Sequence, residues 1–417
     1  MRSVGIVAEF NPLHQGHVEH INESRRISDR TNVIVVMSGN FVQRGEPAIL
    51  DKWLRTKAAL LNGVDIVIEL PVSFVLCGAD YFARGAVELL EKTGVVDAIS
   101  FGSESGNIDA IRNAAHVLAT EPDLFKRVLK EKLGLGFSYA AARGFALQAC
   151  LPDSPEGLFT KPNNGLGIEY VKAVKLLGSK MEIFTTHRKP GGPSATMLRK
   201  EILGGERTET GHLAPECEKM SRGMDIHTTE NIFPNFFSVF RREQPQVAPK
   251  SEFLFGAQYN KYAQIDDFSD IFRYLLFTKK DLYLGEGLEN RFRKFAGDFT
   301  KISEVIDAVK TKRYTHTRLQ RAVLRTVLGL PNECGKPGYI RVLGFRRESA
   351  DLLGSLVCKA KLPAITNGRE LDKILTGGGE AGSMLRKELE AGDVYRIATQ
   401  GIGGVLCERG NRIVIFS

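Results

Sequence analysis

The first hundred residues predict a doubly wound α/β domain with a parallel sheet. Two observations support this fold class: short, unbroken apolar runs alternate with amphipathic segments, and glycines or a proline end several of these segments. Unbroken apolar strands are typical of parallel sheets that helices cover on both faces. In such sheets ligands bind at the carboxyl ends of the strands, near the topological switch.

Each predicted element has its own sequence signal. The strands are apolar, often β-branched runs, and the helices repeat apolar residues at spacings of three and four. Gly63 and Gly94 are suitable helix ends, and Pro71 stops the third strand. The predicted strands are residues 4–10, 32–39, 64–71 and 97–104, and the predicted helices are residues 17–28, 50–63 and 80–94.

The rest of the chain predicts the end of this domain and two further parts. After several helical segments, "KMEIFTTHR" predicts a returning strand and "SATMLRKEILGG" a capped helix, so the first domain covers residues 1–204. Residues 205–251 are polar, turn-rich and contain prolines, which predicts a connecting segment. Residues 252–417 predict a mainly helical α+β region. The helical segments expected before the returning strand are residues 107–120, 122–136, 138–151 and 167–178.

The composition is that of a soluble globular protein, with 43% hydrophobic and 25% charged residues among 417. No apolar run is long enough to cross a membrane, and the N-terminus lacks the pattern of a signal peptide. The six cysteines are scattered and form no CxxC pair, so neither a cysteine-only zinc site nor a disulfide framework is expected. These features predict a cytoplasmic protein that does not bind membranes.

The stretch "EFNPLHQGHVEHI" places His14 and His17 around Gly16, where the first strand ends and the first helix begins. A helix N-terminus has free N–H groups and a partial positive charge, which suit a phosphate, and a glycine lets the backbone approach it. Two histidines there can donate to phosphate oxygens during phosphoryl attack. The pattern favours a nucleotide triphosphate site. A chance pair and a metal site are alternatives, but no third metal ligand is evident, so we expect no metal there.

The segment "GIVAEFNPLHQGH" resembles the HxGH signature of the nucleotidylyltransferase superfamily, whose fold resembles that of class I aminoacyl-tRNA synthetases. Further motifs are similar to one bacterial family, the tRNA(Met) cytidine acetate ligases. The similarity covers nearly the whole chain and is weak only over residues 205–250. The motifs that carry it are "VMSGNFVQRGEPA", "KWLRTKAALLNGVDIVIELP", "FGSESG", "KPNNGLGIEYVKA", "PSATMLRKEI", "EGLENR", "TKRYTHTRLQR" and "PGYIRVLGF".

The resemblance implies a nucleotidylyltransferase-like Rossmann domain and an ATP-dependent ligase. In that family ATP and acetate give acetyl-adenylate, and the acetyl group then passes to N4 of the wobble cytidine of elongator tRNA(Met), which gives N4-acetylcytidine. The resemblance therefore implies ATP as co-substrate, with Mg²⁺ expected on chemical grounds. It also implies acetate and elongator tRNA(Met) as partners, and no protein partner is expected.

The resemblance also implies the residues of the ATP site. His14, His17 and Arg199 would act in catalysis, with the histidines on the phosphates and Arg199 offsetting charge on pyrophosphate. Ser194 is either a phosphate donor or a plain N-cap, and Glu9 either orders the strand end or touches ribose. The implied ATP contacts are Val7, Ala8, Glu9, Phe10, Asn11, Pro12, Leu13, His14, Gln15, Gly16, His17, Val18, Glu19, His20, Gly102, Asn163, Arg188, Ser194 and Thr196.

The chain departs from the family pattern at one place. Only "KPGGP", residues 189–193, separates Arg188 from Ser194, where the family usually has a longer loop with an aspartate- and histidine-containing stretch. We therefore expect the short loop to close differently over ATP.

A basic segment, "KTKRYTHTRLQRAVLR" at residues 310–325, has six Lys/Arg and no acidic residue, and the net charge is +8. Beside a nucleotide-activating domain this favours RNA binding, with a solvated basic helix as the alternative. A single helix would place the arginines at spacings of three and four on one face, with a tyrosine able to stack on bases. Gln43 and Arg44 could meet the cytidine or the acyl group. The predicted RNA-binding residues are Lys310, Lys312, Arg313, Tyr314, Arg318, Arg321 and Arg325.

Two other functions are weighed against this one. An adenylyltransferase that acts on a small phosphorylated metabolite would not need the long basic second half of the chain. An RNA-binding protein with a degenerate nucleotide site would not need intact His14, Gly16 and His17.

Overall fold

The computed structural model describes residues 2–188, 195–204, 262–279, 282, 284–285, 287–400 and 408–416. An eight-stranded sheet lies at its centre. The five strands that the first domain contributes run parallel to one another, which confirms the predicted sheet. In sheet order the strands are β10 (Val414–Phe416), β8 (Ile340–Arg346), β5 (Ile66–Leu70), β2 (Asn32–Ser38), β1 (Ser3–Ala8), β6 (Ala98–Ser103) and β7 (Glu182–His187), and β9 (Ala364–Ile365) pairs with β8 outside this path.

The C-terminal region contributes strands to this sheet, which the predicted division at residue 252 does not anticipate. β8 runs antiparallel to β5, and β10 and β9 run parallel to β8. Every residue of β5 is buried, so without a neighbour its backbone would form an apolar sheet edge. β8 covers that edge, and the end of the chain therefore folds back onto the first domain.

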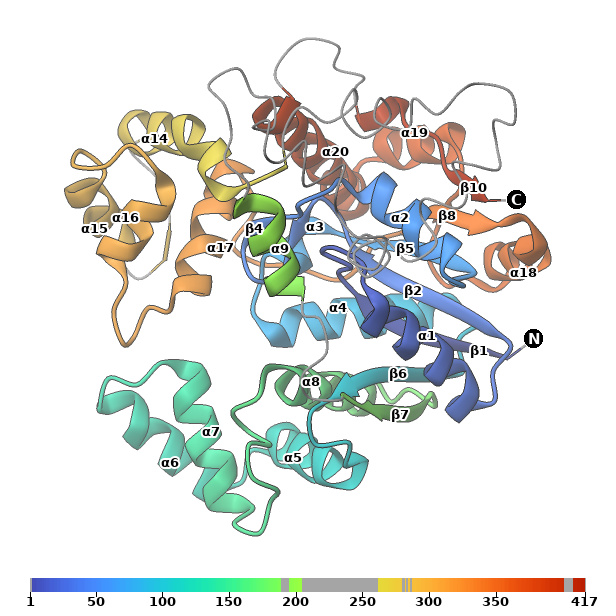
Figure 1. Ribbon diagram of the computed structural model, residues 1–417, viewed down its shortest axis with the longest axis horizontal. Helices are drawn as coiled ribbons and strands as arrows, with labels where there is room; N and C mark the ends of the chain where they lie inside the picture. Colours follow the sequence, from blue (N-terminus) through green and yellow to red (C-terminus); the bar gives the residue numbers. More distant parts are fainter. Residues whose placement is uncertain are drawn as a thin grey trace.

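Helices cover both faces of the sheet (Figure 1). β2 illustrates this: Ile34 and Val36 belong to one buried core cluster, and Val33 and Val35 belong to another on the opposite face. This arrangement confirms the doubly wound class. The helices of the first domain are α1 (Gln15–Ser28), α2 (Lys52–Leu61), α3 (Val72–Val75), α4 (Ala79–Lys92), α5 (Ile108–Thr120), α6 (Asp123–Gly134), α7 (Tyr139–Cys150), α8 (Pro162–Leu176) and α9 (Ala195–Gly204).

The second half forms a helical group with its own core. Phe268, Phe272 and Phe292 pack there, and Phe41 and Val72 from the first domain join the same cluster. The two parts are therefore packed together through apolar contacts. The elements of the second half are η1 (Ile265–Phe268), α14 (Ser269–Thr278), α15 (Leu288–Phe295), α16 (Ile302–Val309), α17 (His316–Val327), η2 (Arg347–Ser349), α18 (Ala350–Lys359), α19 (Gly368–Gly377), α20 (Gly379–Gln400) and η3 (Glu408–Gly410).

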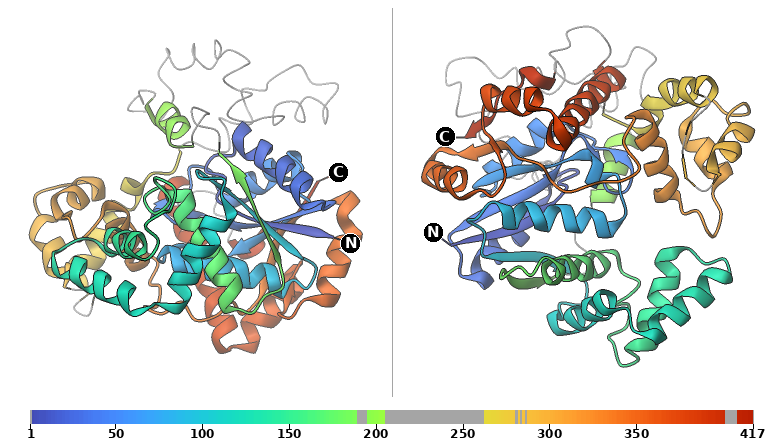
Figure 2. Two further views of the ribbon diagram at one scale, coloured as in Figure 1. Left: turned by 90° about the horizontal axis from the view of Figure 1, so that it is seen from below. Right: turned by 180° about the vertical axis from the view of Figure 1, so that it is seen from behind.

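Two helical groups flank the side of the molecule where the parallel strands end. One consists of α14 to α17 and the other is the α6–α7 hairpin, and both lie on the same side of the sheet in the two views of Figure 2. α17 reaches the strand ends directly, because Arg321 donates to the carbonyl oxygen of Gln43, which follows β2. Between β2 and α2, a short ribbon formed by β3 (Phe41–Val42) and β4 (Glu46–Pro47) provides this contact.

The sequence predicts no disulfide framework, and the described residues contain a single pair. Cys77 and Cys334 are paired as a disulfide between the segment after α3 and the segment before β8, although 257 residues separate them in the sequence. A pairing across such a separation leaves no local spacing signal. Cys150 and Cys358 are free, whereas Cys217 and Cys407 lie outside the described residues. No helix in the described part of the chain is long and apolar enough to span a membrane.

Candidate functional site

Two histidines cap the first helix. His14 is the N-cap of α1, and its Nδ1 atom accepts a hydrogen bond from the backbone N–H of Gly16 at 3.1 Å. In return, Nδ1 of His17 accepts from the backbone N–H of His14 at 3.2 Å. A Cβ on Gly16 would lie 3.1 Å from the His14 ring, so glycine gives this ring its room. The predicted pair therefore sits at the helix N-terminus, as the sequence indicates.

The capping bonds fix which nitrogen of each ring can donate to a ligand. Because both Nδ1 atoms accept from backbone N–H groups, the proton of each neutral ring is on Nε2. The two rings are stacked, with centroids 3.8 Å apart and planes inclined by 29°. His14 and His17 thus present two neighbouring Nε2–H donors at the positive end of α1, which is an arrangement suited to phosphate oxygens.

Burial keeps this group of histidines neutral. It lowers the pKa of His14 to about 4, and the nearby positive charge of Arg188 acts in the same direction. His20, whose Nδ1 lies 2.8 Å from the hydroxyl of Thr186 on β7, has its pKa lowered to about 4 by the same two causes. Burial also lowers the pKa of His17, with further contributions from the other two histidines and Arg188. The rings are therefore neutral near pH 7, and they can donate hydrogen bonds without carrying a charge.

β6 and β7 bring two further predicted residues beside the histidines. The backbone N–H of Arg188 donates to the carbonyl oxygen of Ser103 at 2.9 Å, which extends the β6–β7 pairing by one residue. A Cβ on Gly102 would lie 3.2 Å from Cγ of Arg188, so the side chain of Arg188 packs directly on this glycine. Gly102 and Arg188 are thus neighbours, and Arg188 is close enough to affect the pKa of His14.

Asn163 lies at the N-terminus of α8 and is held by Glu104. The side-chain amide of Asn163 donates to Glu104 Oε1 at 2.7 Å, and its backbone N–H donates to the same atom at 3.2 Å. The backbone N–H of Asn164 donates to Glu104 Oε2 at 2.8 Å. Glu104 therefore caps α8. A nucleotide contact by Asn163 would use its side-chain oxygen or displace the carboxylate.

Arg199 joins α9 to the turn that follows β1. Its guanidinium donates to the carbonyl oxygen of Asn11 at 2.7 Å and lies 3.8 Å from Glu46 in the β3–β4 ribbon. Thr196 is exposed one turn earlier on α9, 3.5 Å from the same guanidinium. The structure therefore brings Arg199 and Thr196 to the predicted ATP segment. Ser194 and residues 189–193 lie outside the described residues.

Glu9 is directed at the ribbon after β2. Its carboxylate accepts from the backbone N–H of Gln43 at 2.6 Å and from the hydroxyl of Ser38 at 3.3 Å. Burial raises the pKa of Glu9, while the Gln43 hydrogen bond and the charge of Arg55 oppose this shift. Of the two roles weighed for Glu9, these contacts favour ordering the strand end over touching ribose.

Arg55 is a residue of this site that the sequence analysis missed. It is 1% exposed and donates to the carbonyl oxygens of Glu9 at 2.6 Å and Ser38 at 3.1 Å, and also to that of Gly39. One guanidinium thus holds the ends of β1 and β2 together. The available signal was its position on the apolar face of α2, one turn after Lys52, since buried arginines need several acceptors.

The basic segment at residues 310–325 is not one helix. α17 begins at His316, and Lys310, Lys312 and Arg313 lie exposed in the preceding loop. Here Thr315 has extended backbone as the N-cap of α17, so the helix cannot continue toward Lys310. The prediction that one helix begins at Lys310 is therefore wrong, because the helix begins at His316.

Tyr314 and the arginines of α17 have defined positions. Arg318 lies over the Tyr314 ring, 5.1 Å from its centroid. Arg321 donates to Gln43 and Arg325 to the carbonyl oxygens of Ser73 and Leu76, so these two hold α17 on the first domain. Burial lowers the pKa of Arg321 to about 10. The arginines do share one face of α17, but Arg321 and Arg325 use it to contact the first domain. RNA binding by the predicted residues stays a prediction.

Comparisons with known proteins point to one family. The family model described as HIGH Nucleotidyl Transferase matches residues 1–404. A curated tRNA(Met) cytidine acetate ligase of Thermoanaerobacter sp. (strain X514) is 36% identical over 408 residues, which cover 95% of this chain and 96% of that relative. A second, of Caldanaerobacter subterraneus subsp. tengcongensis, is 38% identical with the same coverage. A crystal structure of Thermotoga maritima TmcAL bound with alpha-thio ATP has a TM-score of 0.84 and 29% identity, covering 100% of both chains.

Proposed function

We propose, since this chain belongs to the tRNA(Met) cytidine acetate ligases within the HIGH nucleotidyl transferase family, that it uses ATP to join acetate to N4 of the wobble cytidine of elongator tRNA(Met). The observation that carries the proposal is the pair of neutral imidazoles at the start of α1, whose Nε2–H groups are set as donors by the backbone. Because tRNA is its substrate, we propose that the enzyme works in the cytoplasm.

The first step forms acetyl-adenylate. A carboxylate oxygen of acetate attacks the α-phosphorus of ATP, the bond to the bridging oxygen breaks, and pyrophosphate leaves with the electron pair. His14 and His17 donate Nε2–H bonds to phosphate oxygens where charge increases, at the positive end of α1. Arg199, held against Asn11, offsets negative charge on the leaving pyrophosphate.

The second step transfers the acetyl group. The N4 amine of the cytidine attacks the acetyl carbonyl, and the bond to the adenylate oxygen breaks, so AMP leaves and the amine loses a proton. Mg²⁺ that accompanies ATP would be held mainly by the phosphates, because no three metal-ligating side chains gather in the part of the chain that the structure describes. Its charge would add to that of Arg199 and Arg188.

RNA binding is assigned to the edge of the second half that flanks the strand ends. Lys310, Lys312 and Arg313 form an exposed basic loop, and Arg318 stacks on Tyr314 beside it. Contacts from such side chains to phosphates would make binding strongly dependent on salt. Arg321 and Arg325 would contribute indirectly, because they hold α17 against the first domain.

A reconstituted reaction tests the function. Purified protein, ATP, acetate and unmodified tRNA(Met) should yield N4-acetylcytidine at the wobble position, detected by mass spectrometry of nuclease digests. Reactions that lack ATP or acetate, or that contain a tRNA with uridine at that position, should yield none. Transfer of AMP to a small phosphorylated metabolite without RNA would instead identify an adenylyltransferase. RNA binding without any turnover of ATP would identify a degenerate site.

A further inference from the structure

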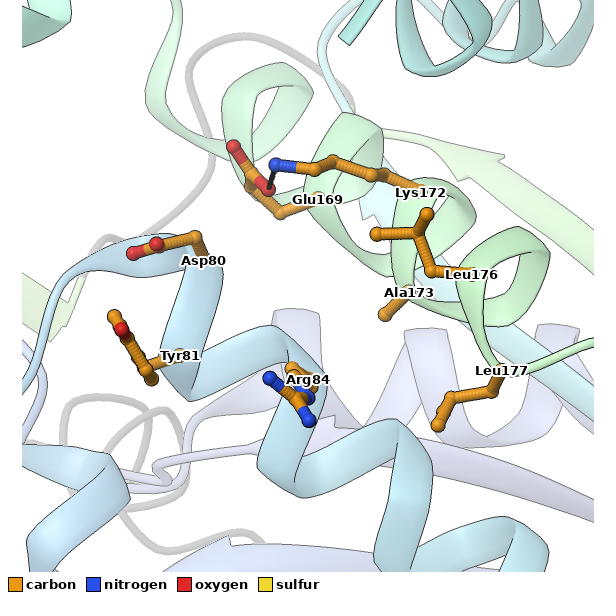
Figure 3. Close-up of a pocket in the computed structure, with 8 residues that line it drawn as sticks. All are labelled: Asp80, Tyr81, Arg84, Glu169, Lys172, Ala173, Leu176 and Leu177. Carbon is orange, nitrogen blue, oxygen red and sulfur yellow. Dashed lines mark ion pairs between the residues drawn. The ribbon is translucent and has the colours of Figure 1, made fainter. Parts of the chain in front are cut away.

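A groove lies between α4 and α8, outside the histidine site, and no step of the reaction above uses it. Its volume is about 380 Å³, which is within the range of small-molecule sites. Figure 3 shows Asp80, Tyr81 and Arg84 on α4, facing Glu169 and Lys172 on α8. We refer to the cavity that these residues line, with Leu176 at its far end, as the α4–α8 groove.

The groove carries unused polar groups beside an exposed aromatic ring. Asp80 and Arg84 are exposed, and neither forms a hydrogen bond or ion pair with the other residues that the structure describes. Tyr81 is 44% exposed. Glu169, in contrast, is 2% exposed and already balanced by Arg143 and by Lys172, whose Nζ lies 3.4 Å away. The groove thus offers a free acceptor, a free donor and a ring face.

This chemistry fits a nucleobase better than a phosphate. The free carboxylate of Asp80 lies in the same lining as Arg84 and disfavours a phosphate, whereas the edge of a base presents donors and acceptors together. Carboxylates accept from amino groups such as cytosine N4, and arginine donates to ring nitrogens and carbonyl oxygens. Tyrosine rings stack on unpaired bases, which is how single-stranded RNA is usually recognised. An unstacked nucleotide therefore matches the size and the polarity of the α4–α8 groove.

The surroundings of the groove favour RNA over a free nucleotide. Arg143 on α7 forms an ion pair with Glu169 in the lining, which places α7 beside the groove, and Tyr139 lies one turn earlier on the same helix. Tyr139 is 56% exposed. The α6–α7 hairpin carries further exposed aromatic and basic side chains suited to a polyanion with bases, namely Phe137, Phe145, Lys126, Arg127 and Lys130.

α8 also links the groove to the reaction site. Glu169 lines the groove, and the next residue, Tyr170, is buried close enough to Glu9 to have its pKa raised by that carboxylate as well as by burial. Consecutive residues of α8 therefore face the groove and the buried side near Glu9.

We propose that the α4–α8 groove, with Tyr139 at its edge, holds an unstacked nucleotide of the RNA substrate other than the one that reacts. This inference rests on the RNA-modifying function proposed above. It assigns Tyr81 and Tyr139 to stacking, and Asp80 and Arg84 to the edge of the base.

Tyr139→Ala tests the proposal, with Tyr139→Phe as the conservative variant and Tyr274→Ala as the matched control, since Tyr274 on α14 is 67% exposed and lies outside the groove. Loss of one stacked base should raise Kd and KM for unmodified tRNA(Met) by roughly 5- to 100-fold. Tyr139→Phe and Tyr274→Ala should leave both unchanged. Acetate-dependent exchange of pyrophosphate into ATP without RNA should be equal in all four proteins.

The outcomes separate the two proposals. If wild type acetylates the RNA and Tyr139→Ala binds it equally well, the groove assignment is wrong and the function stands. If wild type gives no acetylcytidine but Tyr139→Ala still weakens RNA binding, the groove assignment stands and the function is wrong. Loss of pyrophosphate exchange in Tyr139→Ala would identify a structural role and overturn the groove assignment. Saturable AMP or CMP binding that the variant loses, with RNA affinity unchanged, would overturn it too.

Discussion

Two buried groups of titratable side chains lie near the carboxyl edge of the sheet, and they are built in opposite ways. The histidine group consists of His14, His17 and His20, and in the described residues none of them forms an ion pair with a carboxylate. The ion cluster, in contrast, contains acidic and basic residues in contact with one another. Its members are Lys52, Glu69, Arg341, Glu388, Arg396 and Glu408.

Each charge of the ion cluster meets a partner within the protein. Lys52 Nζ lies 2.5 Å from Glu69 and 2.8 Å from Glu408, and Arg341 lies 2.9 Å and 3.2 Å from the same two carboxylates. Glu388 accepts from the backbone N–H of Val72 at 2.6 Å. These residues come from α2, β5, β8, α20 and η3, so the cluster ties both halves of the chain together.

The difference indicates which group binds a ligand. A cluster whose charges are all paired within the protein has no free charge with which to bind a substrate, so its role is to stabilise the fold. The histidine group has donors and nearby positive charge without a counter-ion, so an anion gains more by binding there. Burial alone does not distinguish the two groups, whereas the presence or absence of internal partners does.

Breaking the ion cluster should have the largest effect on the free energy of unfolding. Lys52→Met removes the cation that Glu69 and Glu408 share, and removing one partner of a buried ion pair typically costs about 3–5 kcal/mol. We expect a loss of that size in the free energy of unfolding, measured by urea denaturation. Lys130→Met, at an exposed position on α6, should change it by less than about 0.5 kcal/mol. Equal stability of the two variants would mean that the cluster contributes nothing to folding.

Removing one ring of the histidine group should act on rate and leave RNA binding intact. His17→Ala deletes one Nε2–H donor, and loss of such a donor typically lowers kcat by about 100- to 1000-fold. Steady-state acetylation of tRNA(Met) measures kcat, and filter binding measures RNA affinity. His116→Ala, at an exposed histidine on α5, is the control and should retain wild-type kcat. An unchanged kcat in His17→Ala would contradict the assignment of the ring to the phosphates.

Local patterns in the sequence predict much of the first domain. The strands expected at residues 4–10, 32–39, 64–71 and 97–104 are present as β1, β2, β5 and β6. They are predictable because the signal for such a strand, an unbroken apolar run, lies within the strand's own residues. The histidine pair is predictable for the same reason, since the strand, the turn and the helix that position it are contiguous. Long-range pairing has no such signal: β8 joins β5 through contacts between residue 66 and residue 345.

The same limit explains what the sequence did not reveal of the site. Lys52 and Arg55 stand out as charges on the apolar face of α2, but their acceptors include Glu408, more than three hundred residues away. Helical spacing placed Arg321 and Arg325 on one face of α17 without indicating what that face contacts. Partner identity therefore depends on tertiary structure even where the face is predictable.

The pH dependence of stability should also distinguish the groups. Burial lowers the pKa of His14 to about 4, so its contribution to stability is present above pH 6.5 and is lost as pH falls toward 4. His14→Asn keeps a good N-cap but cannot titrate. We expect the variant to lose about 1–3 kcal/mol less than wild type between pH 7 and pH 4.5, measured by urea unfolding. Parallel losses in the two proteins would show that the His14 ring is not the titrating group.

Glu388 in the ion cluster should give the opposite dependence and the smallest effect. Burial and the charge of Glu69 raise its pKa to about 8, while Lys52 opposes the shift. Its contribution to stability is therefore present below pH 4.5 and is lost as pH rises through 8. Glu388→Gln keeps an acceptor for the N–H of Val72 and carries no charge. The unfolding free energy of wild type should fall by about 1 kcal/mol relative to the variant between pH 6 and pH 7. A constant difference would mean that Glu388 is already ionised at pH 6 and that Lys52 balances it fully. The ion cluster would then be insensitive to pH across this range, and only the histidine group would titrate with a change in stability.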